Sequence, residues 1–105
     1  MNIVILIPIY NDWRSVSKLL EDINSNISNL DYKFSIIIVN DASTEESSIN
    51  NSNFANIQSV KIINMKENMG HARCIATGLK HIFEKEEFDY VIPMDGDGED
   101  RPEEI

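Results

Sequence analysis

The sequence predicts an α/β fold, built as one half of a doubly wound sheet whose strands run mainly parallel. Short continuous apolar runs alternate along the chain with segments whose apolar residues recur at helical spacing. Such alternation implies parallel strands joined by right-handed helical crossovers. The length of 105 residues and the hydrophobic content of 42% fit a single domain, residues 1–105, with its own core.

Four segments are predicted to be strands, because each is an apolar run bounded by polar or turn-forming residues: 2–9, 34–40, 59–64 and 89–94. The first of them, NIVILIPI, is apolar at every position after its initial asparagine. A continuous run of this kind is typical of a strand that is buried on both faces of a sheet.

Two segments, 13–27 and 71–85, are predicted to be helices. Asp12 is a suitable N-cap for the first helix. Its apolar stripe keeps helical spacing and consists of Val16, Leu19, Leu20, Ile23 and Ile27. In the second helix we expect Cys74 to be half-buried and the apolar face to consist of Ala72, Ile75, Ala76, Leu79, Ile82 and Phe83. The polar stretch 42–56 is expected to be a loop with one short helix.

The net charge of -9 is concentrated in one part of the chain, since residues 84–105 hold ten acidic and two basic residues. That charge would repel nucleic acids and anionic lipid head groups, so we expect no nucleic-acid partner. The single cysteine cannot form an internal disulfide, and no apolar run is long enough to span a bilayer. We therefore expect a cytoplasmic location.

The polar groups with chemical potential follow the predicted strands. In a sheet of this kind, ligands bind beyond the carboxyl ends of the strands. The segments found there are 10–12, Asp41, 68–71 and 95–99. We expect these four segments to meet at one edge of the sheet and to form one site.

Asp95, Asp97 and Glu99 alternate directly after the last predicted strand. Carboxylate oxygens with no histidine or cysteine beside them suit a hard cation such as Mg²⁺ or Mn²⁺. The alternative is a solvated acidic turn, in which Asp100 caps a following helix and acidic residues favour the helix N-terminus. The spacing alone is compatible with both interpretations.

Asp41 and Gly70 also have two interpretations each. The Asp41 carboxylate could accept hydrogen bonds from a nucleobase edge, or it could cap the turn in which it lies. Gly70 permits close approach of the backbone to a ligand, and amides at the start of the second helix would suit an anion. An ordinary strand-to-helix turn would contain the same residues.

Four stretches together resemble the nucleotide-binding half of family 2 glycosyltransferases of the GT-A fold: IPIYND (7–12), VNDAST (39–44), ENMGHARCIATGL (67–79) and MDGDGEDRPEEI (94–105). They occur in the order and at the spacing of that family. The resemblance is closest to the branch that contains dolichyl-phosphate mannose synthase and polyprenyl-phosphate glycosyltransferases, and it covers essentially the whole chain. It implies a Rossmann-like sheet with the strand order 3-2-1-4.

The resemblance also implies roles for individual residues. It assigns the nucleotide to residues of three loops: Pro8 and Tyr10 at the base pocket, Asp12 near the base or ribose, Asp41 on the base, and Gly70 and His71 at the border of the nucleotide. It assigns Mg²⁺ or Mn²⁺ on the donor diphosphate to Asp95 and Asp97, with Asp97 catalytic through the metal and Glu99 as a third ligand. Ala42 departs from the family, which usually has glycine there.

The activity implied is inverting transfer of a sugar from a nucleoside-diphosphate sugar to an acceptor such as a polyprenyl phosphate or another sugar. The acceptor half and any general base would lie outside these 105 residues, so we expect the chain alone to transfer no sugar and the full-length form to act at the cytoplasmic membrane face. An exposed sheet edge predicts self-association into a homo-oligomer. The main alternative is a non-catalytic nucleotide-binding module.

Overall fold

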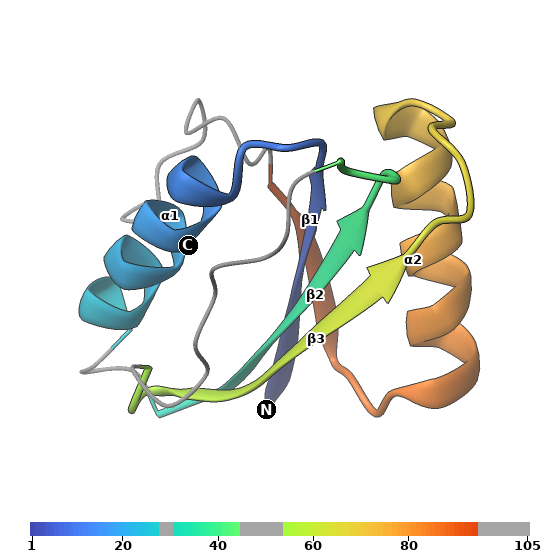
Figure 1. Ribbon diagram of the computed structural model, residues 1–105. Coiled ribbons are helices and arrows are strands. Elements are labelled where there is room, and N and C mark those ends of the chain that lie inside the picture. The colour runs from blue at the N-terminus through green and yellow to red at the C-terminus, as the bar shows by residue number, and fades with distance from the viewer. Residues whose placement is uncertain (28–30, 45–53, 95–105) are drawn as a thin grey trace.

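The structure, a computed structural model, describes residues 1–27, 31–44 and 54–94. These residues form six elements in the order β1 (Asn2–Ile9), α1 (Trp13–Asn26), β2 (Lys33–Asn40), β3 (Ile57–Asn64), α2 (His71–Lys85) and β4 (Tyr90–Pro93). The four strands pair in parallel in the order β3-β2-β1-β4. Helices α1 and α2 cover opposite faces of the sheet (Figure 1). The predicted α/β class and strand order are confirmed.

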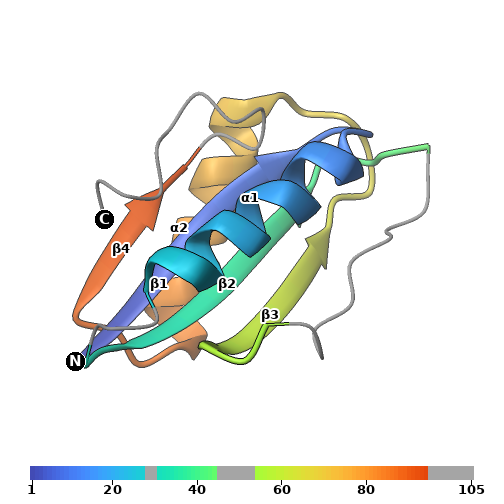
Figure 2. The same ribbon diagram turned by 90° about the vertical axis from the view of Figure 1, so that its left-hand side faces the viewer.

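Strand β1 lies at the centre of the sheet and is covered on both faces (Figure 2). Its odd-numbered isoleucines, Ile3 to Ile9, belong to the apolar cluster under α1. Val4 and Leu6 point the other way, into the cluster under α2. Because successive side chains of a strand point to opposite faces, the continuous apolar run is the pattern that a doubly covered strand requires.

Helix α1 matches its prediction closely. The Asp12 side chain caps it by accepting a hydrogen bond from Ser15 N at 3.4 Å. All five residues of the predicted stripe are buried, and Trp13 joins them at 4% exposure. The stripe therefore packs α1 onto the face of the sheet that carries the β1 isoleucines.

Helix α2 has the predicted bounds, but the predicted apolar face is partly wrong. Its buried residues are Cys74, Gly78 and Ile82, with Ile75 and Leu79 packed beside them. Ala72 and Ala76 are exposed, and Phe83 is 69% exposed. Compared with the predicted orientation, the helix is rotated about its axis so that Gly78 faces the sheet. Because glycine has no side chain, the helix backbone can approach Leu6 and Val39 closely there.

The remaining differences in element bounds are small, and α1 and β2 each differ from the prediction by one residue at one end. Strand β3 starts earlier than predicted, and β4 is shorter at both ends. Residues 45–53, in the stretch expected to contain a short helix, lie outside the described residues. No helix in the described part of the chain has the length and apolar character needed to cross a membrane.

Candidate functional site

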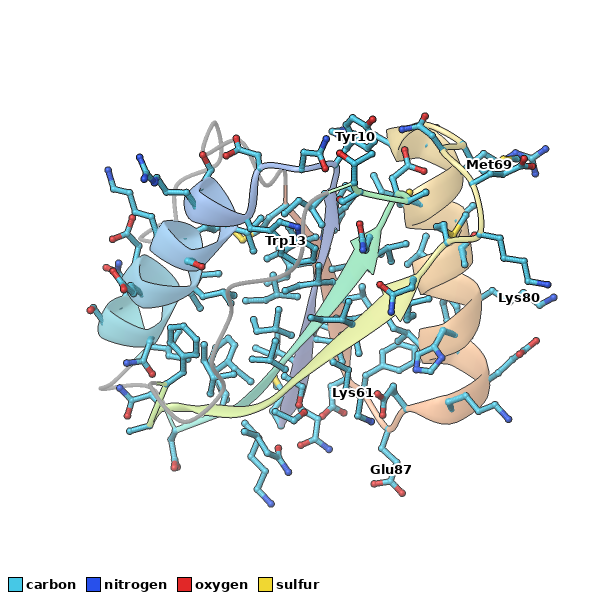
Figure 3. The ribbon with its side chains drawn as sticks, in the orientation of Figure 1. Tyr10, Trp13, Lys61, Met69, Lys80 and Glu87 are labelled. Atoms are coloured by element: carbon cyan, nitrogen blue, oxygen red, sulfur yellow. The ribbon has the colours of Figure 1, made fainter. Side chains whose placement is uncertain are left out.

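The loops that follow β1, β2 and β3 meet at one edge of the sheet, as the topology predicts. Asp41 N donates to Ile9 O at 2.8 Å, and Met65 N donates to Asn40 O at 2.8 Å, so the three strand ends stay in register up to this edge. Tyr10 and Met69 both lie there, at the top of Figure 3. Residues that are distant in the sequence are thus brought together at the carboxyl ends of the strands.

Asp41 is a buried acidic residue at this edge of the sheet. It is 1% exposed, and its two carboxylate oxygens accept hydrogen bonds from Met69 N at 2.7 Å and Gly70 N at 2.9 Å. The Asn68 side chain also donates to Asp41 O, at 3.3 Å. The amides of Met69 and Gly70 are therefore occupied by the protein's own carboxylate. These contacts hold the turn after β3, whereas the turn-capping interpretation concerned the turn in which Asp41 itself lies. The contact of Asp41 with a nucleobase stays a prediction.

Cys74, on the first turn of α2, is fully buried rather than half-buried. Burial raises the pKa of its thiol to about 11, and the hydrogen bond to Asp41 and the negative charge of that carboxylate act in the same direction. Cys74 is therefore a neutral thiol at physiological pH. Since the thiolate is the nucleophilic form, this residue is a structural donor to Asp41 and not a nucleophile.

Around this buried pair, four other predicted nucleotide-binding residues are exposed and form the rim: Tyr10, Asp12, Gly70 and His71. Tyr10 is 45% exposed at the end of β1, whereas Pro8 is buried and pairs with Val39. Gly70 has a φ of 88°, which favours glycine, and it is followed by the exposed His71. The Asp12 residue is exposed, although one of its oxygens caps α1. The rim thus combines an accessible aromatic ring, a carboxylate and a turn that needs glycine.

From the sequence, no role was assigned to four polar residues that lie at the end of β2 and in the loops after β1 and β2: Asn11, Asn40, Ser43 and Thr44. They are linked to one another by hydrogen bonds. Asn11 and Ala42 also have positive φ angles of 62° and 57°. Hydrophobic periodicity carries no information about such residues. The available signal was the asparagine after Tyr10, because asparagine is enriched in left-handed conformations.

The described part of the chain ends at Met94, directly before the acidic stretch. Met94 is 5% exposed, and its N–H donates to Leu6 O at 2.9 Å, three residues before the end of β1. The predicted metal ligands Asp95, Asp97 and Glu99 lie outside the described residues. Within the ranges that are described, no group of three histidine, cysteine, aspartate or glutamate residues could hold a metal ion.

A polar hollow of about 320 Å³ lies at the opposite end of the sheet. It is lined mainly by polar residues, among them Asn2, Ser35, Gln58, Ser59, Lys61 and Glu86. Lys61 and Glu87, two of its lining residues, lie far from Tyr10 in Figure 3. Because this hollow is at the amino ends of the strands, it is separate from the candidate site.

Comparison with known proteins agrees with the architecture. Residues 4–105 match the family model described as glycosyl transferase family 2. The chain is 31% identical over 103 residues to an undecaprenyl-phosphate 4-deoxy-4-formamido-L-arabinose transferase of Proteus mirabilis, and 33% identical over 104 residues to a protein of the same name from Pseudomonas syringae. These alignments cover 96% of this chain but only 30% and 29% of the relatives.

Among solved structures, the chain is similar to S. aureus TarS. The fragment 1–349 of TarS superposes with a TM-score of 0.62 at 21% sequence identity, over 92% of this chain and 28% of the TarS chain. A second TarS structure gives a TM-score of 0.63 at 20% identity. At this level of identity the similarity shows the fold, which is that of the GT-A enzymes.

Proposed function

Because the chain belongs to glycosyl transferase family 2, we propose that it binds a nucleoside-diphosphate sugar at the carboxyl edge of its sheet and supplies the donor half of an inverting sugar transferase. The observation that carries this proposal is the meeting of the Tyr10, Asp41 and Gly70 loops at one edge. In parallel α/β sheets this edge is where nucleotides bind.

The nucleobase half of the donor lies against Tyr10 in this proposal. Pro8 and Tyr10 line the base pocket, Asp12 lies near the base or ribose, and Gly70 and His71 border the nucleotide. The partial exposure of Tyr10 supports this role, because an aromatic face that is open to solvent can stack on a base. Asp41 is proposed to contact the base as well as to hold the Met69–Gly70 turn that borders it.

The diphosphate half lies at the acidic stretch. Asp95, Asp97 and Glu99 would hold Mg²⁺ or Mn²⁺, and their oxygen-only donor set suits such hard cations. The buried Met94 brings the chain to the carboxyl edge just before these residues, which supports their proximity to the nucleotide. A bound cation would neutralise the charge of the diphosphate leaving group, and Asp97 would act in catalysis through it.

The proposed acceptor is a polyprenyl phosphate, since undecaprenyl phosphate appears in the names of the relatives from Proteus mirabilis and Pseudomonas syringae. The chain spans less than a third of the length of those relatives. Binding of the acceptor phosphate, whose ionised oxygen would attack the sugar, is therefore assigned to residues outside this chain, as is any general base that a sugar hydroxyl acceptor would need instead. The 105 residues alone are expected to transfer no sugar. The site of action of the full-length form would be the cytoplasmic face of the membrane.

We expect self-association through the outer edge of β4. Within the described residues this strand pairs only with β1, so its other edge offers unpaired backbone groups. Tyr90, which is 59% exposed, lies on this strand. Light scattering should detect a dimer or larger assembly that Tyr90→Lys weakens; a monomeric wild-type protein would contradict this expectation.

Calorimetry with UDP and GDP, with and without Mn²⁺, tests the donor site. We expect binding that strengthens when Mn²⁺ is present and an Asp97→Ala variant that has lost the Mn²⁺ effect. Glu84→Ala is the matched control, because it removes an exposed carboxylate of α2. Unchanged Mn²⁺-dependent binding by Asp97→Ala would refute the metal assignment. Binding without transfer by a full-length form would favour a non-catalytic nucleotide-binding module.

A further inference from the structure

Asn11 has a backbone conformation that few residues tolerate. Its φ of 62° lies in the left-handed region, where asparagine is enriched among the residues other than glycine. Around it the chain makes a tight turn, in which Asp12 N donates to Tyr10 O at 2.8 Å and Trp13 N donates to Asn11 O at 2.9 Å. Asn11 therefore lies in the turn that joins Tyr10 to the N-cap of α1.

Both the backbone and the side chain of Asn11 bind the loop after β2. Its N–H donates to Ser43 Oγ at 2.8 Å, and its Oδ1 accepts from Thr44 N at 2.7 Å and from Thr44 Oγ1 at 3.3 Å. Three hydrogen bonds between the same two loops define their relative position much better than one bond would. The left-handed conformation is maintained by these contacts, because they surround the residue that adopts it.

The loop that Asn11 contacts is itself anchored to the sheet. Ser43 N donates to Asn40 Oδ1 at 3.0 Å, and Asn40 Nδ2 donates to Asn64 Oδ1 at 2.9 Å. Asn40 and Asn64 are the last residues of β2 and β3 and are paired in register. A continuous path of hydrogen bonds thus runs from the turn beside Tyr10 to the ends of two strands.

We propose that Asn11 is a positioning residue for the nucleobase: it fixes the backbone of Tyr10, and thereby the aromatic ring at the rim, for stacking on the base of a nucleoside diphosphate. This inference rests on the proposed function. Tyr10 is held by β1 on one side and by the Asn11 turn on the other. A tyrosine side chain has only two rotatable torsions before its hydroxyl, so a fixed backbone leaves its ring few orientations.

The contribution of Asn11 acts through Tyr10 and does not involve the metal. Loss of its Oδ1 should therefore weaken the binding of UDP and GDP by the same factor with and without Mn²⁺. We expect the dissociation constants of UDP and GDP to rise about tenfold, which corresponds to the free energy of about one hydrogen bond. In a Tyr10→Ala background the same change should have no further effect, because the ring that Asn11 positions is then absent.

The experiment measures UDP and GDP affinity by calorimetry for a set of variants. Asn11→Gly keeps the left-handed backbone accessible but removes the acceptor, and Asn11→Asp keeps both an acceptor oxygen and tolerance of positive φ. Ser43→Ala removes the partner of the Asn11 N–H from the opposite loop. Asn56→Ala is the control, since it removes the side-chain hydrogen bond to Asn24 O outside these loops.

We expect about tenfold weaker binding for Asn11→Gly, weaker binding also for Ser43→Ala, near wild-type affinity for Asn11→Asp, and no change for Asn56→Ala. Wild-type affinity of a folded Asn11→Gly protein, or equal losses in the wild-type and Tyr10→Ala backgrounds, would overturn the positioning role alone. If Asn11→Gly does not fold, the affinities of Ser43→Ala in both backgrounds decide in the same way. Failure of the wild-type protein to bind UDP and GDP would instead overturn the proposed function, and the positioning role with it.

Discussion

Gly78 of α2 faces Leu6 of β1 with no room for a side chain between them: a Cβ at position 78 would overlap Leu6 Cδ1 and lie 3.1 Å from Val39 Cγ2. Leu6 and Val39 are fully buried, so neither can move into solvent to make space. This contact sets the distance between α2 and the sheet, and it explains why the buried face of α2 is centred on a glycine.

Gly78→Ala should therefore destabilise the protein, by about 1 kcal/mol. Overpacking costs about 1–3 kcal/mol, and the higher helix propensity of alanine returns up to about 1 kcal/mol. Urea denaturation measures the change in the free energy of unfolding. Lys80→Ala, at an exposed position of the same helix, is the control and should change it little. A Gly78→Ala protein that is more stable than wild type would show that the helix can move away from Leu6.

Ala42→Gly should leave the protein unchanged or make it up to about 1.5 kcal/mol more stable. Ala42 has a φ of 57°, and a residue with a Cβ pays about 1–2 kcal/mol in that region. Glycine removes this strain but loses about 0.5–1 kcal/mol in backbone entropy. Thermal denaturation should show the opposite effect for Ala42→Val, because a β-branched residue tolerates positive φ poorly. Equal stability of the glycine and valine variants would contradict the left-handed assignment.

The stability of the protein should fall between about pH 9 and pH 11 through Cys74. The folded state raises the pKa of this thiol from 9.0 to about 11, so above pH 9 the unfolded state loses the proton first. The stability that comes from the bound proton is fully present below pH 9 and is lost as the pH rises toward 11. It corresponds to roughly 3 kcal/mol, because the pKa differs by about two units between the two states and each unit is worth about 1.4 kcal/mol.

Melting temperatures of wild type and Cys74→Ala across this pH range test the effect. Tyrosine and lysine residues titrate in the same range, so the informative quantity is the difference between the two proteins. Their melting temperatures should converge as the pH approaches 11. Parallel curves would mean that the thiol titrates alike in the folded and unfolded states.

Asp41→Ala should lower the free energy of unfolding by about 3 kcal/mol, because two partly buried amide donors lose a charged acceptor. Asp41→Asn should also destabilise the protein, since an amide nitrogen would face one of the two N–H groups. Nucleotide affinity measured well below the melting temperature separates the two roles of Asp41. A loss of UDP or GDP affinity in the folded variants supports contact with the base, and unchanged affinity reduces Asp41 to a capping residue.

The sequence predicted those parts of the fold that follow from hydrophobic periodicity. The apolar runs of β1 and β2 are nearly continuous, the stripe from Val16 to Ile27 has the helical period, and the structure confirms all three. The face of α2 was predicted partly wrong because glycine and cysteine were not counted as core residues, although close backbone approach and a small thiol suit a tight interface.

The candidate site was predictable only in outline. The rule that loops meet at the carboxyl edge located Tyr10, Asp41 and Gly70 correctly at one edge. The partners of the individual side chains could not be predicted, because they depend on which loops become neighbours in three dimensions. Asp41 bonding to the amides of Met69 and Gly70, and Asn11 bonding to Thr44, are long-range contacts of this kind.

The central position of β1 has a consequence for how the chain folds. This strand precedes both of its partners, and β4 follows it by more than eighty residues. When distant segments pair in parallel, the loop-closure entropy is lost before the strand contacts contribute favourable energy. The domain should therefore fold slowly for its size. During synthesis an apolar eight-residue segment stays unpaired until β2 and then β4 emerge, and such a segment is prone to aggregate. Chaperone dependence during expression should therefore be set by β1, although β1 is the best-buried strand of the finished sheet.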